Sequence, residues 1–265
     1  GIRNLSKSFG EKKLFEGISL KVEGGERIAL IGDNGTGKST LIKMIVDEAY
    51  PDSGRIRLGP QVKLAYLPQI IHFDHPDWNL VENMMAAKRG ISAQSARNRL
   101  AAYDFRGEDV LKPVSVLSGG EQSRLRLCML MDESINLLIL DEPTSMLDPL
   151  AARNLLATVQ RINRELGVAI LLTEHRLDEV FPAADRVVTM DRGRILSDGA
   201  PAEIARQLSG SAEKSRIYFG LPAAVRIFSE LEQTEDLPLT VRDGRRRLER
   251  LLPITEETSV PETAK

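Results

Sequence analysis

The feature that most constrains this chain is a glycine-rich loop between a short apolar run and an apolar-faced helical pattern. The loop from Gly32 to Thr40 has the sequence GDNGTGKST, and Arg27 to Ile31 before it has the composition of a buried strand. Thr40 to Val46 has the pattern of the start of a helix. A glycine-rich loop needs this strand–loop–helix context to bind phosphate. The sequence therefore predicts an α/β fold built around a phosphate site.

The residue types of this loop (a Walker A pattern) suit a triphosphate. Gly32, Gly35 and Gly37 admit backbone angles closed to other residues and bring no side chain, so backbone N–H groups can surround a phosphate. The helix that we expect to start near Ser39 adds its positive dipole end. We expect Lys38 to reach the β- and γ-phosphates and the Ser39 hydroxyl to bind Mg²⁺. Two further loop residues expected to contact the nucleotide are Asn34 and Thr40.

A second apolar run ends in two carboxylates, as in a Walker B pattern. Ile135 to Leu140 is unbroken, which is expected of a parallel strand covered on both faces, and Asp141 and Glu142 follow it. Ligands of open α/β sheets bind at the carboxyl ends of the strands. Asp141 therefore fits an outer-shell position around Mg²⁺. Glu142 fits the general base that orients and activates an attacking water.

A third phrase joins a helix cap to two glycines. Leu117 to Glu121 has the sequence LSGGE and precedes Gln122 to Met131, where apolar residues recur at helical spacing. Ser118 is a good N-cap residue, and Gly119 and Gly120 let a backbone approach an anion closely. Alone, Ser-Gly-Gly is also an ordinary turn. Beside the other two phrases it predicts an anion-binding helix start.

In their order along the chain, the three phrases resemble those of the ATP-binding cassette (ABC) ATPases, over residues 1 to about 206. The resemblance implies an α/β P-loop NTPase fold with a RecA-like core of the ABC type, at 1–68 and 135–206, and a mostly helical signature subdomain at 69–134. Residues 207–265 form a small C-terminal extension, and we expect a disordered tail from about 253. The family binds ATP with Mg²⁺ and hydrolyses it to ADP and phosphate.

The resemblance also assigns roles to residues outside the three phrases. Phe9, expected before the first strand, occupies the place of the aromatic that stacks on adenine. Gln69 ends a YLPQ phrase like the family's Q-loop, which touches Mg²⁺ and the water. Ser145 to Asp148 occupies the position of the D-loop, which contacts the opposite subunit. His175 follows the apolar run Val168 to Leu172 and matches the switch histidine that contacts the γ-phosphate. The expected catalytic residues are thus Glu142, His175 and Gln69, and the expected Mg²⁺ contacts are Ser39, Gln69 and Asp141.

The family mechanism requires a second cassette. Two cassettes pack head to tail, so that ATP on the phosphate loop of one is covered by Ser118 to Gly120 of the other. This chain has one copy of each motif and no internal repeat, so we expect a homodimer or a heterodimer with another cassette. Binding of two ATP molecules would close the pair, and hydrolysis at Glu142 would let it open.

Composition sets bounds on the remaining possibilities. Lys and Arg number 36 against 38 Asp and Glu, so the net charge of −2 gives no global attraction to nucleic acid, and no direct DNA binding is expected. The single cysteine, Cys128, excludes an internal disulfide framework and fits a reducing cytoplasm. No apolar run approaches the ~18 residues that span a bilayer, and no signal peptide is visible. A chain that starts at Gly1 rather than Met fits a trimmed or excised segment.

Two polar clusters have alternative interpretations. The first lies just after Gln69, before candidate helices at 80–88 and 93–102, and we interpret it as a polar loop because no metal-ligand spacing supports a metal site. The second is a run of arginines in the extension, which is either a solvated helix face or a surface for phosphates. The first cluster comprises His72, Asp74, His75 and Asp77, and the second Arg242, Arg245, Arg246, Arg247 and Arg250.

The two halves of the chain resemble different ABC groups. From Gly1 to about Met131, phrases such as residues 59–69 and 107–115 resemble ABC-F proteins, soluble tandem cassettes that act on ribosomes. From Ser145 onward, Thr173 to Val180 and Asp191 to Ile195 resemble importer ATPases, especially those of energy-coupling factor transporters. The chain is thus interpreted as a mosaic with a seam near residues 140–145, from a divergent lineage, a recombined gene or a deliberate chimera.

Three functional hypotheses follow. We favour an ATPase subunit that powers a membrane importer through membrane transporter subunits, at the inner face of the plasma membrane. The alternative is an ABC-F-like translation factor with the ribosome as its partner, against which stand the missing tandem copy and the missing inter-cassette linker. DNA-repair and chromosome ATPases carry a long coiled-coil insertion, for which the stretch between Gln69 and Leu117 is too short.

Overall fold

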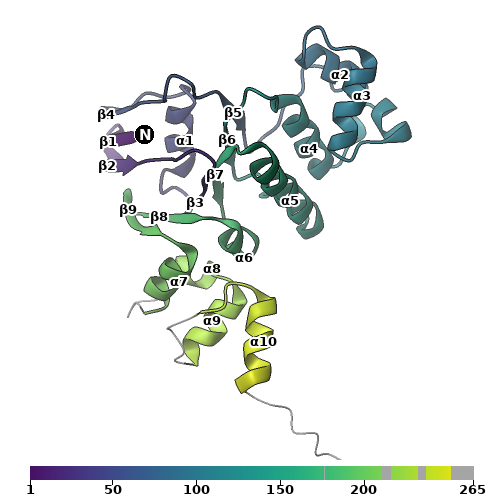
Figure 1. Ribbon diagram of the computed structural model, residues 1–265. Helices are drawn as coiled ribbons and strands as arrows, with labels where there is room; N and C mark the ends of the chain where they lie inside the picture. Colours follow the sequence, from purple (N-terminus) through teal and green to yellow (C-terminus); the bar gives the residue numbers. More distant parts are fainter. Residues whose placement is uncertain (176, 211–215, 232–236, 252–265) are drawn as a thin grey trace, which may run out of the picture.

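The computed structural model describes residues 1–175, 177–210, 216–231 and 237–251, so the predicted disordered tail lies outside the described residues. Its centre is a six-stranded sheet with the strand order β5-β6-β7-β3-β8-β9 (Figure 1). Neighbouring strands are parallel except at the β8–β9 pair, which is antiparallel. The strands are β3 (Arg27–Gly32), β5 (Leu64–Leu67), β6 (Leu137–Asp141), β7 (Ala169–Glu174), β8 (Arg186–Asp191) and β9 (Arg194–Gly199). The apolar runs at 27–31, 135–140 and 168–172 are thus strands, with ends that differ by one or two residues.

Two helices cover opposite faces of this sheet. In β3, Ile28 and Leu30 pack into one core with helix α1 (Lys38–Ile45). Ala29 and Ile31, the alternate residues of the same strand, pack into a second core with α5 (Pro149–Leu166). Because successive side chains of a strand point to opposite faces, a strand buried on both sides must be apolar throughout. This explains the unbroken apolar runs of the sequence.

A second, three-stranded antiparallel sheet has the order β2-β1-β4. Its strands are β1 (Ile2–Phe9), β2 (Lys12–Leu20) and β4 (Ser53–Ile56). The expectation that Phe9 precedes the first strand was wrong, because Phe9 is the last residue of β1 and pairs with Lys12 of β2. The turn between them contains Gly10 with a positive φ of 58°, which lets the hairpin close directly after Phe9.

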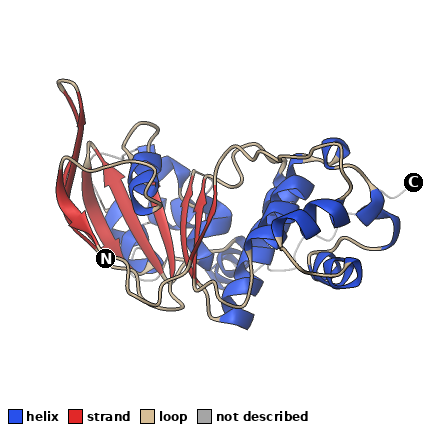
Figure 2. Ribbon diagram, turned by 90° about the horizontal axis from the view of Figure 1, so that it is seen from above, coloured by secondary structure: helices blue, strands red, loops and turns tan. Residues whose placement is uncertain are grey.

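The segment after Gln69 contains α2 (Leu80–Ala87), α3 (Ala93–Ala102) and α4 (Gly119–Leu130), with short 3₁₀ turns between them. These helices share a core of their own, in which Leu80, Leu100 and Leu125 are fully buried. Seen from above, they extend away from the strands (Figure 2). Helix α4 begins directly after Ser118, which is its N-cap as predicted and forms a capping box with Glu121.

The chain after β7 adds short helices that pack onto the main core. They are α6 (Leu177–Val180), α7 (Pro201–Ser209), α8 (Arg216–Gly220), α9 (Ala223–Glu230) and α10 (Val241–Leu251). Leu208, Val225 and Phe228 belong to the same apolar core as Ile170 and Leu172 of the sheet. The described residues after 206 are therefore packed onto the main core.

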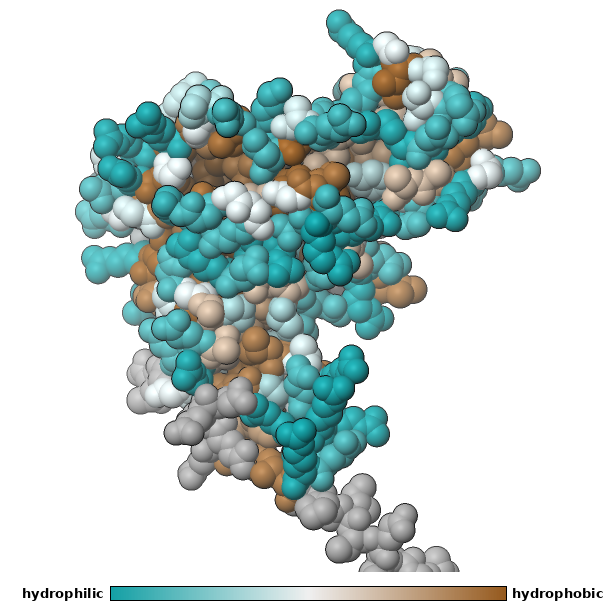
Figure 3. Space-filling model, viewed as in Figure 1, coloured by the Kyte–Doolittle hydropathy of each residue, from teal (hydrophilic) through white to brown (hydrophobic). Residues whose placement is uncertain are grey.

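The arginine run lies on α10. Arg242, Arg245, Arg246 and Arg250 are exposed and Arg247 is half-buried, whereas Gly244 packs against Ala224 of α9. Figure 3 shows the hydrophilic side chains along this helix at the lower edge of the molecule. This is the solvated helix face of the first interpretation, and it leaves the phosphate alternative open.

No helix in the described ranges is both long and apolar enough to cross a bilayer.

The shared core predicts that the residues after 206 contribute to the stability of the whole domain. Phe228 is 1% exposed, and Phe228→Ala should lower the free energy of unfolding by about 3–5 kcal/mol in urea titrations. Ile227 is 50% exposed, and Ile227→Ala should change it by about 1 kcal/mol or less. Equal, small effects of both substitutions would show that this region does not stabilise the core.

Candidate active site

The predicted phosphate loop lies between β3 and α1, over the carboxyl edge of the parallel sheet. Gly37 takes the left-handed backbone conformation with a φ of 102°, and a Cβ there would lie 2.7 Å from the ring of Phe15. Only glycine meets both conditions. A pocket of about 130 Å³ opens above this loop. It is lined by Leu14, Asn34, Gly35, Gly37, Lys38, Ser39, Thr40 and Glu142.

Lys38 is the buried cation of this pocket, with 3% of its side chain exposed. Its Nζ donates to the carbonyl oxygens of Gly32 (2.7 Å) and Asp33 (3.1 Å), and it lies 3.8 Å from Oε1 of Glu142. Burial lowers the pKa of Lys38, while the nearby carboxylates of Glu142 and Asp141 act in the opposite direction. A desolvated cation at the wall of a pocket interacts strongly with an anion that enters it.

Oxygen ligands gather around Asp141 at the end of β6. The Ser39 hydroxyl donates to Oδ1 of Asp141 at 3.0 Å, and the Thr173 hydroxyl donates to the same oxygen at 2.8 Å. Asp141 is only 4% exposed, so these two hydroxyls fix the direction of its carboxylate. Hydroxyl and carboxylate oxygens are the hard donors that Mg²⁺ prefers, and the donor set fits this ion.

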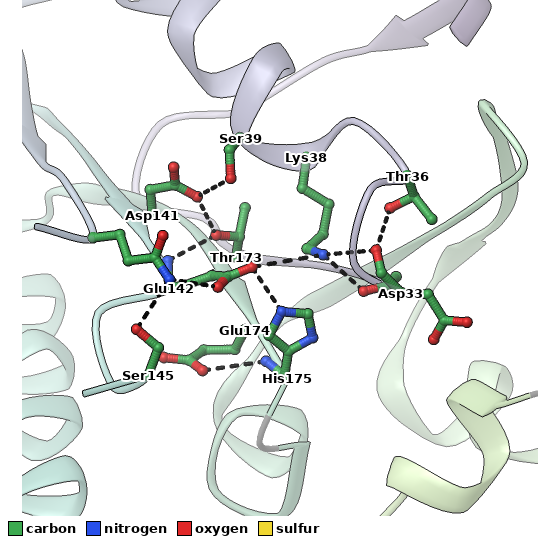
Figure 4. A network of polar contacts seen from close by, with 12 residues as sticks. Asp33, Thr36, Lys38, Ser39, Asp141, Glu142, Ser145, Thr173, Glu174 and His175 are labelled. Atoms are coloured by element: carbon green, nitrogen blue, oxygen red, sulfur yellow. Dashed lines mark hydrogen bonds and ion pairs between the residues drawn. The ribbon is translucent and has the colours of Figure 1, made fainter. Parts of the chain in front are cut away.

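Glu142 joins the remaining predicted catalytic side chains. Nε2 of His175 lies 2.7 Å from its Oε1, and Nε2 of Gln69 donates to its Oε2 at 3.0 Å. Figure 4 shows Glu142 between Lys38, Ser145 and His175, at the ends of β6 and β7. Its backbone has a φ of 47°, a left-handed conformation that is disfavoured for a residue with a side chain. Strained backbone of this kind is common at functional sites.

The Ser-Gly-Gly phrase lies apart from this cluster. Ser118 caps α4 by accepting from the N–H of Glu121 at 3.4 Å, and none of the residues 118–120 lines the pocket over the phosphate loop. A Cβ on Gly120 would lie 2.7 Å from the Cβ of Ala151, so glycine allows α4 to pack closely on α5. Within the described chain, the phosphate loop and the Ser-Gly-Gly phrase belong to separate surfaces.

Of the other residues predicted to contact the nucleotide, some line the pocket and one does not. Asn34 and Thr40 line the pocket, as expected of loop residues, whereas Phe9 does not. Phe9 is 59% exposed, and the Nζ of Lys7 lies 5.4 Å from the centroid of its ring. In the polar loop after Gln69, His75 stacks on Trp78 with 3.8 Å between the ring centroids. That stacking gives His75 a packing role.

Three polar residues of the site were missed by sequence reasoning. The Thr36 hydroxyl donates to the carbonyl of Asp33 at 2.8 Å and fixes the loop. Thr173 accepts from the N–H of Glu142 through its Oγ1 at 2.9 Å. Glu174, 2% exposed, accepts from the N–H of Thr144 at 2.9 Å. The only signal for the last two was their position, directly before His175 at the carboxyl end of a strand.

Comparisons with known proteins agree with this site. A family model described as ABC transporter matches residues 15–145. An ABC transporter ATP-binding protein of Bacillus anthracis is 35% identical over 275 residues, covering 96% of this chain and 49% of the relative. The zinc import ATP-binding protein ZnuC of Jannaschia sp. (strain CCS1) is 32% identical over 222 residues, covering 83% of this chain and 87% of the relative. The chain thus spans about half the length of the Bacillus relative and nearly all of the Jannaschia one.

Solved structures show the same fold. The ATP-binding cassette MJ0796, in a dimeric post-hydrolysis state bound to ADP and Pi, matches with a TM-score of 0.61. The match covers 76% of this chain and 97% of that one, at 19% sequence identity. At this identity the likeness concerns the arrangement of helices and strands.

Proposed function

Because this chain belongs to the ABC transporter family of ATP-binding proteins, we propose that it hydrolyses MgATP in a head-to-tail pair of cassettes and powers a membrane transporter. The observation that carries the proposal is the cluster around Glu142. The carboxylate of Glu142 is contacted by Gln69 and His175 and lies 3.8 Å from the buried Nζ of Lys38, at the pocket over the phosphate loop. This arrangement suits a base beside a bound triphosphate.

The residues of the site divide the work of hydrolysis. The N–H groups of the loop from Gly32 to Ser39 and the Nζ of Lys38 bind the phosphates. Glu142 accepts a proton from the attacking water, and Gln69 and His175 orient its two oxygens. Ser39, with Asp141 and Gln69 beside it, would hold Mg²⁺, and the ion would neutralise charge on the phosphate oxygens. Asn34 and Thr40 complete the cradle as further nucleotide contacts.

The location of Ser118 to Gly120 supports a site shared between two cassettes. These residues lie outside the pocket over the phosphate loop of their own chain, at the N-terminus of the 12-residue helix α4. A second cassette turned head to tail would bring its own Ser118 to that pocket. The Bacillus relative, of which the match covers 49%, has enough additional chain for a second cassette.

The transporter context rests on the family and on the second half of the chain. Thr173 to Val180 and Asp191 to Ile195 resemble importer ATPases, especially those of energy-coupling factor transporters, and the ZnuC relative is named as an import protein. We therefore propose an importer of the energy-coupling factor type, with membrane subunits as partners at the inner face of the membrane. The ribosome-associated alternative gains no support from the relatives described above.

Glu142→Gln should separate binding from hydrolysis. The amide keeps the shape of the side chain but cannot accept a proton, so ATP turnover should fall by ~10²-fold or more. Nucleotide affinity, which depends on the loop, should stay within about twofold of wild type. Steady-state phosphate release and fluorescent-nucleotide titration measure the two quantities. Unchanged turnover would remove Glu142 from the base role.

A mixing experiment tests the shared site. Lys38→Ala removes the cradle cation and Ser118→Arg blocks the opposite cap, so each variant alone should be nearly inactive. In a mixed head-to-tail pair one site carries both changes and the other carries neither. An equimolar mixture should therefore turn over ATP well above either variant alone. A mixture as inactive as its components, despite mixed pairs in native mass spectrometry, would contradict the arrangement.

Fractionation of cells of the source organism tests the biological context. A transporter ATPase should sediment with membranes and be recovered with its membrane subunit after mild detergent extraction. Ribosomes pelleted from the same cells should not carry the chain. Recovery with ribosomes, and release from them by a non-hydrolysable ATP analogue, would favour the translation-factor alternative instead.

A further inference from the structure

We propose that Glu174 is a positioning residue for hydrolysis. Its carboxylate ties the turn that follows Glu142 to the loop that carries His175, and so holds these two side chains in contact. The inference rests on the proposed role of Glu142 as the base. It concerns a residue that the function described above does not use.

Glu174 joins two backbone segments with one side chain. It is the last residue of β7 and is 2% exposed. Its Oε1 accepts from the N–H of Thr144 at 2.9 Å, and its Oε2 accepts from the N–H of His175 at 3.2 Å. In Figure 4 the side chain of Glu174 lies beneath Glu142, beside His175. Both oxygens of the carboxylate are thus occupied by N–H donors.

The turn after Glu142 needs such a restraint. Glu142 has the disfavoured left-handed backbone. The next backbone N–H groups with hydrogen-bond acceptors are those of Thr144 and Ser145. The N–H of Glu142 is held by Thr173, the N–H of Thr144 by Glu174, and the N–H of Ser145 by the carbonyl of Glu142 at 3.1 Å. Successive residues at the end of β7 therefore restrain successive parts of this turn. Without Glu174, the backbone N–H of Thr144, in the middle of the turn, loses this side-chain acceptor.

Burial and hydrogen bonding act on the Glu174 carboxylate in opposite directions. Burial raises the pKa of Glu174, the nearby carboxylate of Glu142 acts in the same direction, and the N–H donors of Thr144 and His175 act against both. An apolar or amide side chain of similar volume would fill the same space without this cost. Only a carboxylate offers two acceptor oxygens and no donor, which two converging N–H groups require.

Glu174→Gln is therefore a sharp test. The amide keeps the volume, but it has one acceptor oxygen, and its NH₂ group would face a backbone N–H. One of the two segments is released, so the contact between Glu142 and His175 is formed less often. The phosphate loop, between β3 and α1, is not part of this link. Turnover should fall while ATP binding does not.

The experiment compares four proteins: wild type, Glu174→Gln, His175→Ala and the double variant. Glu174→Gln should lower kcat about tenfold or more, with the Kd for ATP within about twofold of wild type. In the His175→Ala background the same change should have little further effect, because the contact that it protects is already absent. Glu165→Gln, on the exposed end of α5, is the matched control and should leave kcat and Kd unchanged.

Three outcomes overturn the proposal. The first is a wild-type kcat in Glu174→Gln, and the second is a loss of kcat in the double variant that equals the product of the two single losses. The third is a change in ATP affinity without a change in kcat. If Glu174→Gln does not fold by circular dichroism, Glu174→Asp serves in the same assays, since its shorter carboxylate cannot span both N–H groups. Unaltered turnover in that variant overturns the proposal too. The base role of Glu142 is tested separately by Glu142→Gln, so failure of one is distinguishable from failure of the other.

Discussion

The parallel pairing of β6 with β7 and of β7 with β3 is the constraint on which the site depends. Parallel strands end at the same edge, and the register pairs Asp141 with Thr173 and Ile31 with Glu174. One edge therefore presents the phosphate loop after β3, the carboxylates after β6 and the histidine after β7. The hydrogen bonds among Ser39, Asp141 and Thr173 follow from this register. A shift of one residue would turn each of these side chains to the opposite face of the sheet.

The sequence predicted the parts of the site that depend on local pattern. Lys38, Ser39 and Asp141 could be placed because a glycine-rich loop and a buried strand each determine where the next residue lies. Glu174 could not be placed this way, because its role depends on a neighbouring strand and on a turn far away in sequence. The left-handed backbone of Glu142 has no sequence signal either, since a glutamate is not expected there.

The residues after 206 show a similar limit of sequence reasoning. Their pattern loosens, which suggested a small extension, yet Tyr218 and Phe228 are buried in the main core. The contact includes residues close to His175: Leu177 lies in the same core, and Asp178 accepts from the N–H of Ala223 at 3.3 Å. The loop of His175 is thus tied on one side to the turn after Glu142 and continues on the other into a helix held by these residues. Long-range burial of this kind leaves little trace in local periodicity.

The same contacts bear on the mosaic interpretation. The proposed seam, residues 140–145, is the segment that links the two halves of the site. Within it, Asp141 binds Ser39 of the first half and Thr173 of the second, and Glu142 binds Gln69 and His175 in the same way. Whatever its origin, a junction here must satisfy partners on both sides, because an unmet buried carboxylate is costly. In the described structure, Asp141 and Glu142 each have hydrogen-bond partners in both halves. A junction among residues whose chemistry both ABC groups share can therefore preserve the ATP site. The surfaces that bind partner proteins can still differ between the groups.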